Sequence, residues 1–360
     1  MDLSALASRF ALRGAVTDVR PLGEGFINDT YCVFVDGASQ PAYILQRKNH
    51  LVFPDVPAMM ENIVAVTRHI KGKVADPERG TLTVVPALDG RWYVQDEGGN
   101  FWAVCTFIQG SKSYERADTP ELARQGGLGL GLFHRQVADF TQPLTEIIKG
   151  FHNIRFRFAQ WDEALRRDAA GRVASLQEEI GWIESRRARM LAFWERFEKG
   201  EIPTRATHND TKISNFLFDA KTGEVLCAID LDTLMSSTLL NDVGDALRSY
   251  TNSGAEDDPD LAKVSMSMPF FRAYMEGYLS QMAGELAPIE IEYLAFSGLY
   301  ITYEQVLRFL MDYIDGDTYY KTKYPEHNLV RTKAQYKLLT SMEEQLPEME
   351  AIVRRLVALP

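Results

Sequence analysis

From residue 15 to residue 109, apolar positions come in short runs separated by turn signals rich in Gly, Asp and Asn. The runs contain many β-branched and aromatic residues, which is typical of β-strands. We expect strands at 16–22, 26–35, 42–47 and 101–108. A further hairpin is expected from 81–85 and 92–95, joined by Asp89-Gly90. A helical period predicts one helix among these strands, at 56–70.

Beyond Gly110 the apolar residues recur at helical spacing. This spacing predicts helices at 120–140, 176–197, 268–282 and 293–313. The C-terminal segment predicts one or two charged amphipathic helices interrupted by Pro347, because proline removes a helical hydrogen bond. The expected fold class is therefore α+β, with a small β-rich lobe at 1–109 and a larger, mainly helical lobe at 110–360.

A glycine-rich run, Gly126-Gly127-Leu128-Gly129-Leu130-Gly131, lies inside one of the predicted helices. It does not fit the G-x-G-x-x-G pattern of dinucleotide-binding loops, and no strand precedes it. We interpret its glycines as positions where another helix packs closely.

Composition and charge narrow the possible functions. The chain has 39 Lys and Arg against 50 Asp and Glu, a net charge of −11, which argues against nucleic acid or an anionic membrane as a partner. No apolar run reaches the roughly 20 residues of a membrane helix, and the N-terminus lacks the basic region of a secretory signal. The three cysteines are widely spaced in apolar stretches, so we expect core residues in a cytoplasmic protein.

Candidate chemistry is concentrated in the stretch THNDTKISNFLF, residues 207–218, and in Asp230 after the apolar run that follows. This is the order H-x-D-x-x-x-x-N followed by a separate Asp that occurs in kinases. Asp210 can accept the proton of an attacking hydroxyl, while the Asn215 amide oxygen and the Asp230 carboxylate are hard ligands for Mg²⁺. The alternative is a polar surface turn with a capping Asp.

These motifs resemble the aminoglycoside phosphotransferase and choline kinase superfamily, and more narrowly the bacterial N-acetylhexosamine 1-kinases. The resemblance includes GEGFINDTY near the N-terminus, YILQRKNHLVFPD after it, AIDLDTLMSSTLLNDVGDALRS, and RFLMDYIDGDTYYKTKYPEHNLVRT near the C-terminus. It implies a two-lobed protein-kinase-like fold that uses ATP and Mg²⁺ to phosphorylate the anomeric hydroxyl of a sugar. Asp210 would be the catalytic base, and Asn215 and Asp230 would hold the metal.

The resemblance also implies roles for residues outside the central motif. Gly23, Glu24 and Gly25 would form a shortened loop over the phosphates. Thr106, Phe107 and Ile108 would form the hinge that offers backbone groups to adenine, although an ordinary buried strand is the alternative. His208 would shape the loop or fill the core, Asp245 would brace the loop from a helix start, and Asp232 would either contact the metal or support its ligands.

Two positions depart from the family pattern. Kinases usually carry a Lys or Arg on the third strand to hold the phosphates, and here Gln46 stands at that place. Strand alternation puts Lys48 on the same face, so either residue could contact phosphate. Phe26 stands where the resemblance leads us to expect a sugar-contacting His, which leaves the identity of the sugar open.

Arg308 and Tyr319 are candidates for sugar recognition. Arg308 lies in an apolar helical context and needs a partner if it faces inward. The alternative for Arg308 is an ion pair with Asp312, and for Tyr319 a loop aromatic that packs on the lobe. The alternative functions are a kinase of another sugar, an aminoglycoside or an amino alcohol, and a catalytically silent nucleotide-binding module. The sequence sets no oligomeric state.

Overall fold

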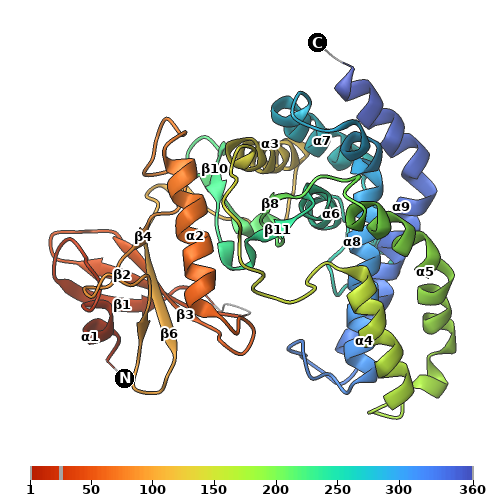
Figure 1. The fold of residues 1–360 in the computed structure, drawn as a ribbon, viewed down its shortest axis with the longest axis horizontal. Coiled ribbons are helices and arrows are strands. Elements are labelled where there is room, and N and C mark those ends of the chain that lie inside the picture. Colours follow the sequence, from red (N-terminus) through yellow and green to blue (C-terminus); the bar gives the residue numbers. More distant parts are fainter. Residues whose placement is uncertain (1, 24–26, 359–360) are drawn as a thin grey trace. The chain divides into compact units, whose positions relative to one another are not determined.

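The computed structural model describes residues 2–23 and 27–358, so Glu24, Gly25 and Phe26 lie outside the described residues. The chain forms two compact units. The first contains 1–112, 139–149 and 217–236, and the second contains 113–138, 150–216 and 237–360. An antiparallel sheet dominates the first unit and helices dominate the second (Figure 1), which confirms the α+β, protein-kinase-like class.

The elements of the first unit include the strands and the helix expected between residues 15 and 109, in the predicted order. They are α1 (Leu3–Ala7), β1 (Val16–Pro21), β2 (Asp29–Val35), β3 (Tyr43–Lys48), α2 (Val56–Lys71), β4 (Val84–Val85), β5 (Val94–Gln95), β6 (Phe101–Thr106), β7 (Ser111–Lys112), β9 (Phe216–Asp219), β10 (Val225–Ala228) and the short 3₁₀ turn η3 (Leu231–Thr233). The main sheet has the order β1-β2-β3-β6-β4, with β5 also on β6. The hairpin expected from 81–85 and 92–95 is wrong, because β4 and β5 each pair with β6.

Strand alternation gives the main sheet two different faces. One face packs apolar side chains against α1, including Val33, Leu45 and Val104. The other face carries Gln46 and Lys48 from β3 and Cys105 from β6, which line a pocket beside α2. The alternation of side chains along β3 therefore places Leu45 in the core and the Lys48 ammonium group at the pocket.

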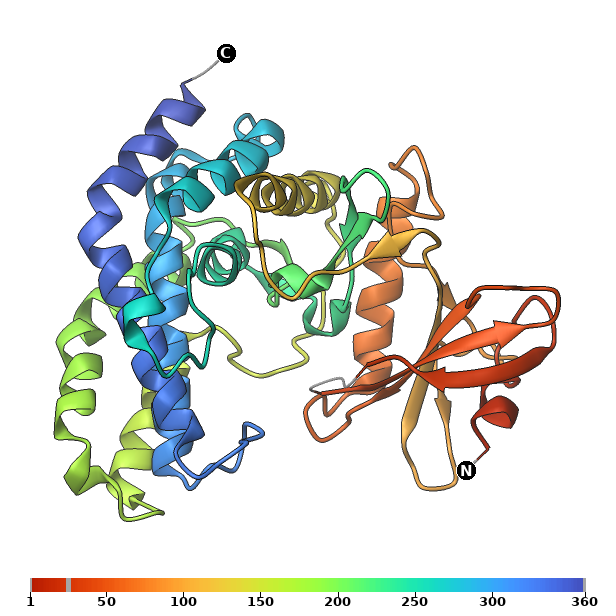
Figure 2. The same ribbon diagram turned by 180° about the vertical axis from the view of Figure 1, so that it is seen from behind.

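The second unit is a helical assembly with a few short strands and turns. Its elements are α3 (Pro120–Val137), α4 (Ile154–Arg167), η1 (Val173–Ser175), α5 (Gln177–Glu198), β8 (Arg205–Thr207), η2 (Ile213–Asn215), α6 (Leu239–Tyr250), η4 (Leu261–Lys263), α7 (Met268–Met282), α8 (Pro288–Ile314) and α9 (His327–Val357), while β11 (Met235–Ser237) crosses the unit boundary along the chain. Long α8 is buried around most of its circumference and lies alongside α9 (Figure 2).

Helix α9 continues through Pro347, so the interruption expected there is wrong. Pro347 lies on the exposed side of α9, where water can hydrogen-bond the carbonyl group that loses its helical partner. No helix in the ranges 2–23 and 27–358 combines the length and apolar character needed to cross a membrane.

The glycine run of α3 packs against α7, as the sequence predicts. A Cβ atom built on Gly127 would lie 2.0 Å from the backbone oxygen of Tyr274, and one on Gly277 would lie 2.0 Å from that of Arg124. The absent side chains thus allow the backbones of α3 and α7 to approach each other.

This packing gives a matched pair of substitutions. Gly127→Ala should lower the free energy of unfolding by about 1–3 kcal/mol, because the methyl group meets backbone that cannot move aside. Gly181→Ala in α5 adds the same methyl group where nothing lies within 4 Å. It should raise the stability by about 0.5–1 kcal/mol through helix propensity. Thermal unfolding of both variants checks this, and equal effects would contradict the packing role of Gly127.

Candidate active site

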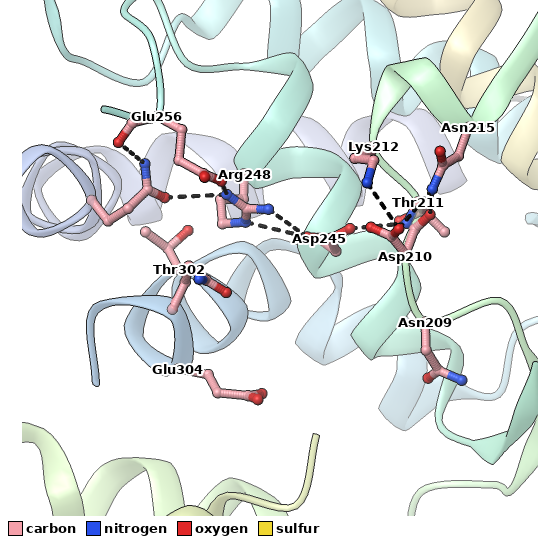
Figure 3. A network of polar contacts seen from close by, with 12 residues as sticks. Asn209, Asp210, Thr211, Lys212, Asn215, Asp245, Arg248, Glu256, Thr302 and Glu304 are labelled. Carbon is pink, nitrogen blue, oxygen red and sulfur yellow. Dashed lines mark hydrogen bonds and ion pairs between the residues drawn. The ribbon is translucent and has the colours of Figure 1, made fainter. Parts of the chain in front are cut away.

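Asp210 lies in the loop of residues 208–215 that follows β8 and ends in η2. Its Oδ2 accepts hydrogen bonds from Asn215 Nδ2 at 2.8 Å and Lys212 Nζ at 3.0 Å (Figure 3). Asn215 Nδ2 also donates to the backbone oxygen of Asp210 at 2.8 Å. The Asp210 and Asn215 side chains, five residues apart in sequence, therefore hold each other in place.

The surroundings of Asp210 favour its ionised form. Burial opposes ionisation of Asp210. It is outweighed by the positive charge of Lys212, by the electrostatic interaction with His208, and by the hydrogen bonds from Lys212 and Asn215. The pKa of Asp210 consequently lies below the ordinary value for a carboxyl group. Within the described part of the chain, Oδ1 has no hydrogen-bond donor, so it can accept one from a bound molecule.

Two carboxylates of α6 fix the backbone of this loop. Asp242 is fully buried and accepts the N–H groups of His208 at 2.8 Å and Asn209 at 2.6 Å. Asp245 accepts the N–H of Thr211 at 2.9 Å, the bracing expected from the sequence, although it lies in the second turn of α6. The N–H groups on both sides of Asp210 thus point at α6.

His208 shapes the loop from inside. Its ring is buried between Phe133 and Phe216, and its Nδ1 accepts the N–H of Asp210 at 3.3 Å. Both readings of the sequence therefore apply, because one imidazole fills the core and supports the loop.

Arg248 extends the support away from the loop. It donates two hydrogen bonds to Asp245 Oδ1, at 2.9 and 3.2 Å, and one to Glu256 Oε2 at 2.6 Å (Figure 3). The acidic residues Glu256 and Asp257 are therefore engaged by other side chains of this chain, since Asp257 also contacts Lys323 and His327.

The first unit contains a second group of candidate residues. Gln46, Lys48 and Asp230 line one pocket. Lys48 Nζ donates to Gln46 Oε1 at 2.8 Å and to Asp232 Oδ1 at 2.7 Å. Asn28 Nδ2 donates to the other oxygen of Asp232 at 2.7 Å. Asp232 thus holds Lys48 of β3 and Asn28, the residue just before β2, a role that sequence reasoning left open.

Asp230 follows β10 in the left-handed conformation, with φ 55° and ψ 55°. This conformation costs energy for a residue other than glycine and is found preferentially at functional sites. Cys105 lines the same pocket, but burial raises its pKa to about 11, so its thiol stays protonated and unreactive.

In the predicted hinge, the N–H groups of Thr106 and Phe107 donate to Thr83 and Ala42, both at 2.9 Å. Among these three residues, only the N–H of Ile108 has no acceptor within the described residues. At the N-terminal loop, Gly23 has φ +66°, a backbone conformation suited to glycine.

Arg308 and Tyr319 come together in the second unit. The Arg308 guanidinium lies 5.4–5.8 Å from the ring centres of Phe151, Tyr319 and Tyr320. The expected alternative, an ion pair with Asp312, does not form. Asp312 instead accepts hydrogen bonds from the N–H groups of residues 318–320 and from Asn328.

The structure thus brings together Asp210 with Asn215, Gln46 with Lys48, and Arg308 with Tyr319. Asp210, Asn215 and Arg308 belong to the second unit, and Asp230 belongs to the first. Sequence reasoning missed the supporting residues Asn28, Asp242, Phe151 and Tyr320. Of these, only Asp242 carried a signal, because it lies one helical turn before Asp245.

An antiparallel sheet followed by a helical unit with this loop defines a kinase-like phosphotransferase. The family model described as the phosphotransferase enzyme family, APH, matches residues 18–288, and the chain belongs to this family. It is a small-molecule phosphotransferase that acts on a hydroxyl acceptor.

Solved structures share the fold at low sequence identity. A microcompartment-associated aminopropanol kinase is 20% identical, with a TM-score of 0.64 over 97% of this chain and 98% of that one. An aminoglycoside phosphotransferase from Alicyclobacillus acidocaldarius is 16% identical, with a TM-score of 0.61 over 99% and 96%. A spectinomycin phosphotransferase in complex with ADP and spectinomycin is 13% identical, with a TM-score of 0.53 over 98% of each chain.

The Lys48–Asp232 pair can be tested by a double-mutant cycle. Both side chains are at least 95% buried, with exposures of 5% and 2%, so removal of one partner leaves a buried charge. Lys48→Met and Asp232→Asn should each lower the free energy of unfolding by about 3–5 kcal/mol. The double variant should lose much less than the sum. Additive losses in denaturant unfolding would show that the two residues do not interact.

Proposed function

We propose that this phosphotransferase moves the γ-phosphoryl group of ATP to the anomeric hydroxyl of an N-acetylhexosamine or a related sugar. Asp210 is the general base that accepts the hydroxyl proton. The observation that carries the proposal is the Asp210 carboxylate, ionised and fixed through Oδ2 while Oδ1 remains available. The ring oxygen makes an anomeric hydroxyl more acidic than an ordinary alcohol, so a carboxylate base suffices.

Asn215 and Asp230 hold Mg²⁺ in this proposal. The Asn215 amide nitrogen donates to Asp210, which leaves the amide oxygen, a hard ligand, for the metal. Two protein oxygens suit Mg²⁺, which takes its other ligands from water and phosphate. When bound, the ion neutralises charge on the transferred phosphoryl group.

Residues 1–109 form the nucleotide-binding lobe in this proposal, and residues 110–360 form the catalytic and substrate-binding lobe. Lys48 and Gln46 supply the donors for the phosphates, and Gly23, Glu24 and Gly25 are the further candidates for phosphate binding. The N–H of Ile108, which has no acceptor among the residues that the structure describes, supports its role as the hinge donor to adenine.

Arg308 and Tyr319 hold the sugar in this proposal. Aromatic rings stack on the C–H faces of sugars, and a guanidinium donates to several hydroxyl groups at once. Asp312 accepts the N–H groups of Tyr319 and Tyr320, which fixes the turn that carries both rings beside Arg308. Tyr319 is 59% exposed, so its ring is accessible to a ligand.

A cationic amino alcohol or aminoglycoside is the competing substrate class. The acidic residues Glu256 and Asp257, which could bind an amine, are engaged by other side chains of this chain. Arg308 adds positive charge at the proposed substrate site, which disfavours an amine there. Both observations support a neutral, hydroxyl-rich substrate.

Asp210→Asn tests the proposed base. It should lower kcat by about 10²–10⁴-fold while the affinity for ATP stays nearly unchanged, because the amide cannot accept the proton. Since the pKa of Asp210 is lowered, the carboxylate is ionised above the ordinary carboxyl range, and kcat/KM should show no acidic limb from Asp210 between about pH 5 and 8. Turnover by Asp210→Asn close to that of the unmodified chain would contradict the assignment.

ADP release over a panel of free sugars, aminoglycosides and amino alcohols tests the substrate class, and phosphorus NMR of the product locates the phosphate. Arg308→Ala should lower kcat/KM for every sugar substrate by about 10-fold or more, whereas Arg166→Ala, a surface control, should not. Phe26→His should shift the preference toward N-acetylhexosamines by up to ~10-fold. Faster turnover of an amine than of any sugar would refute the sugar assignment.

A further inference from the structure

Asn209, the residue before Asp210, has a backbone conformation that needs support. Its φ is +65°, in the left-handed region that costs energy for a residue other than glycine. The Asp242 carboxylate accepts a hydrogen bond from the backbone N–H of Asn209 at 2.6 Å. The Asn209 carbonyl oxygen faces His152, whose Nε2 lies 3.2 Å away.

His152 lies between two acceptors. Its Nδ1 is 3.0 Å from Glu304 Oε2, and its Nε2 faces the Asn209 carbonyl oxygen. A carbonyl oxygen cannot donate a hydrogen bond, and neither can an ionised carboxylate. A neutral imidazole has one N–H and can satisfy only one of these acceptors, whereas an imidazolium satisfies both. The geometry therefore calls for the doubly protonated ring.

The surroundings of Glu304 also favour a doubly protonated His152 ring. It is 1% exposed, and its Oε1 makes no hydrogen bond and lies 3.6 Å from Arg157 Nε. Its one hydrogen bond to a side chain within the described residues is that to His152. Arg157 is one positive neighbour of this carboxylate, but Oε2 is hydrogen-bonded to the His152 ring, and a charged ring makes that bond stronger for a buried anion.

The charged groups around His152 come from two helices. Helix α8 contributes Glu304 and Arg308, and α4 contributes Arg157. The Tyr300 hydroxyl donates to the His152 backbone oxygen and stays neutral, because burial raises its pKa well above the ordinary value. Burial lowers the pKa of His152 and Arg308 opposes its charge, but Glu304 and the Asn209 carbonyl prevail, so the pKa is raised.

We propose that His152, as an imidazolium paired with Glu304, is a positioning residue that fixes the Asn209 carbonyl and thereby the backbone leading into Asp210. The proposal rests on the proposed function, in which Asp210 is the base. Glu304 and Arg308 are four residues apart on α8, so they lie on one face of the helix. Helix α8 therefore carries both the anion that holds the loop through His152 and the cation that binds substrate.

The protonation state can be measured on the unmodified chain, without any activity. In ¹⁵N-labelled protein at pH 8, both ring nitrogens of His152 should have the chemical shifts of protonated nitrogen. The five other histidines give internal references. His152→Gln identifies the signals by their loss. A neutral His152 ring at pH 8 would overturn the proposal, whatever the outcome for the Asp210 variant.

Glu304→Gln tests the link to the loop. It keeps the size of the side chain but removes the charge that raises the pKa of His152. The Gln amide can donate to a neutral Nδ1, so the bond from Nε2 to the Asn209 carbonyl changes from a charge-assisted to a weaker, neutral hydrogen bond. Its kcat should fall about 10-fold at pH 8 and recover toward pH 6 as the imidazole gains its second proton. The unmodified chain should show no such change over this range, and KM for ATP should stay the same in both. A pH profile of kcat parallel to that of the unmodified chain would overturn the proposal.

His69→Gln is the matched control. His69 also pairs with a carboxylate, Asp139, at 2.9 Å, but its partners are in the first unit and do not include the 208–215 loop. Its pH profile should match that of the unmodified chain, and the same profile as Glu304→Gln would overturn the assignment to His152. If Asp210→Asn retains turnover while the His152 ring is doubly protonated, the proposed base fails and the imidazolium assignment stands.

Discussion

The buried carboxylate of Asp242 is the contact on which the active-site loop depends. It accepts the N–H groups of His208 and Asn209, and its Oδ2 also lies 2.9 Å from His134 Nε2 on α3. Backbone N–H groups buried without an acceptor would each cost about 1–3 kcal/mol, so the loop could not keep its left-handed turn without this anion. One side chain thus joins α3, α6 and the loop, and Asp245 repeats the arrangement at Thr211.

The first unit solves a similar problem with Asp232. A lysine on the inner face of β3 needs a counter-charge when it is buried, and Asp232 supplies it from the turn after Asp230. Asn28, which directly precedes β2, donates to the remaining oxygen, so β3 and the segment that leads into β2 are both held by the turn that follows β10. In both units, therefore, a buried carboxylate lies beside the candidate site residues. Each of these carboxylates fixes the positions of the groups that it contacts.

Much of the fold followed from local patterns. Strand alternation and helical periods located most elements, and the glycines of α3 were correctly interpreted as packing positions because they interrupt no helical period. The hairpin at 81–95 was wrong because the turn at Asp89-Gly90 is local, whereas the choice of β6 as the common partner of β4 and β5 depends on distant residues. The prediction at Pro347 was wrong because this residue is exposed to solvent, where water can replace the lost helical hydrogen bond. The residues next to Pro347 in sequence do not show that exposure.

The sequence by itself determined the class of chemistry, since Asp210, Asn215 and Asp230 lie within one short stretch whose spacing is set by a loop and two strands. Only the tertiary structure decided what supports them. Asp242 and His152 meet the 208–215 loop from separate segments, Glu304 meets His152 from α8, and Asp232 meets Lys48 across 184 residues. Such contacts form only when the helices pack and bring distant charged side chains together. The sequence pattern does not show them, because hydrophobic periodicity reports only on residues that are close along the chain.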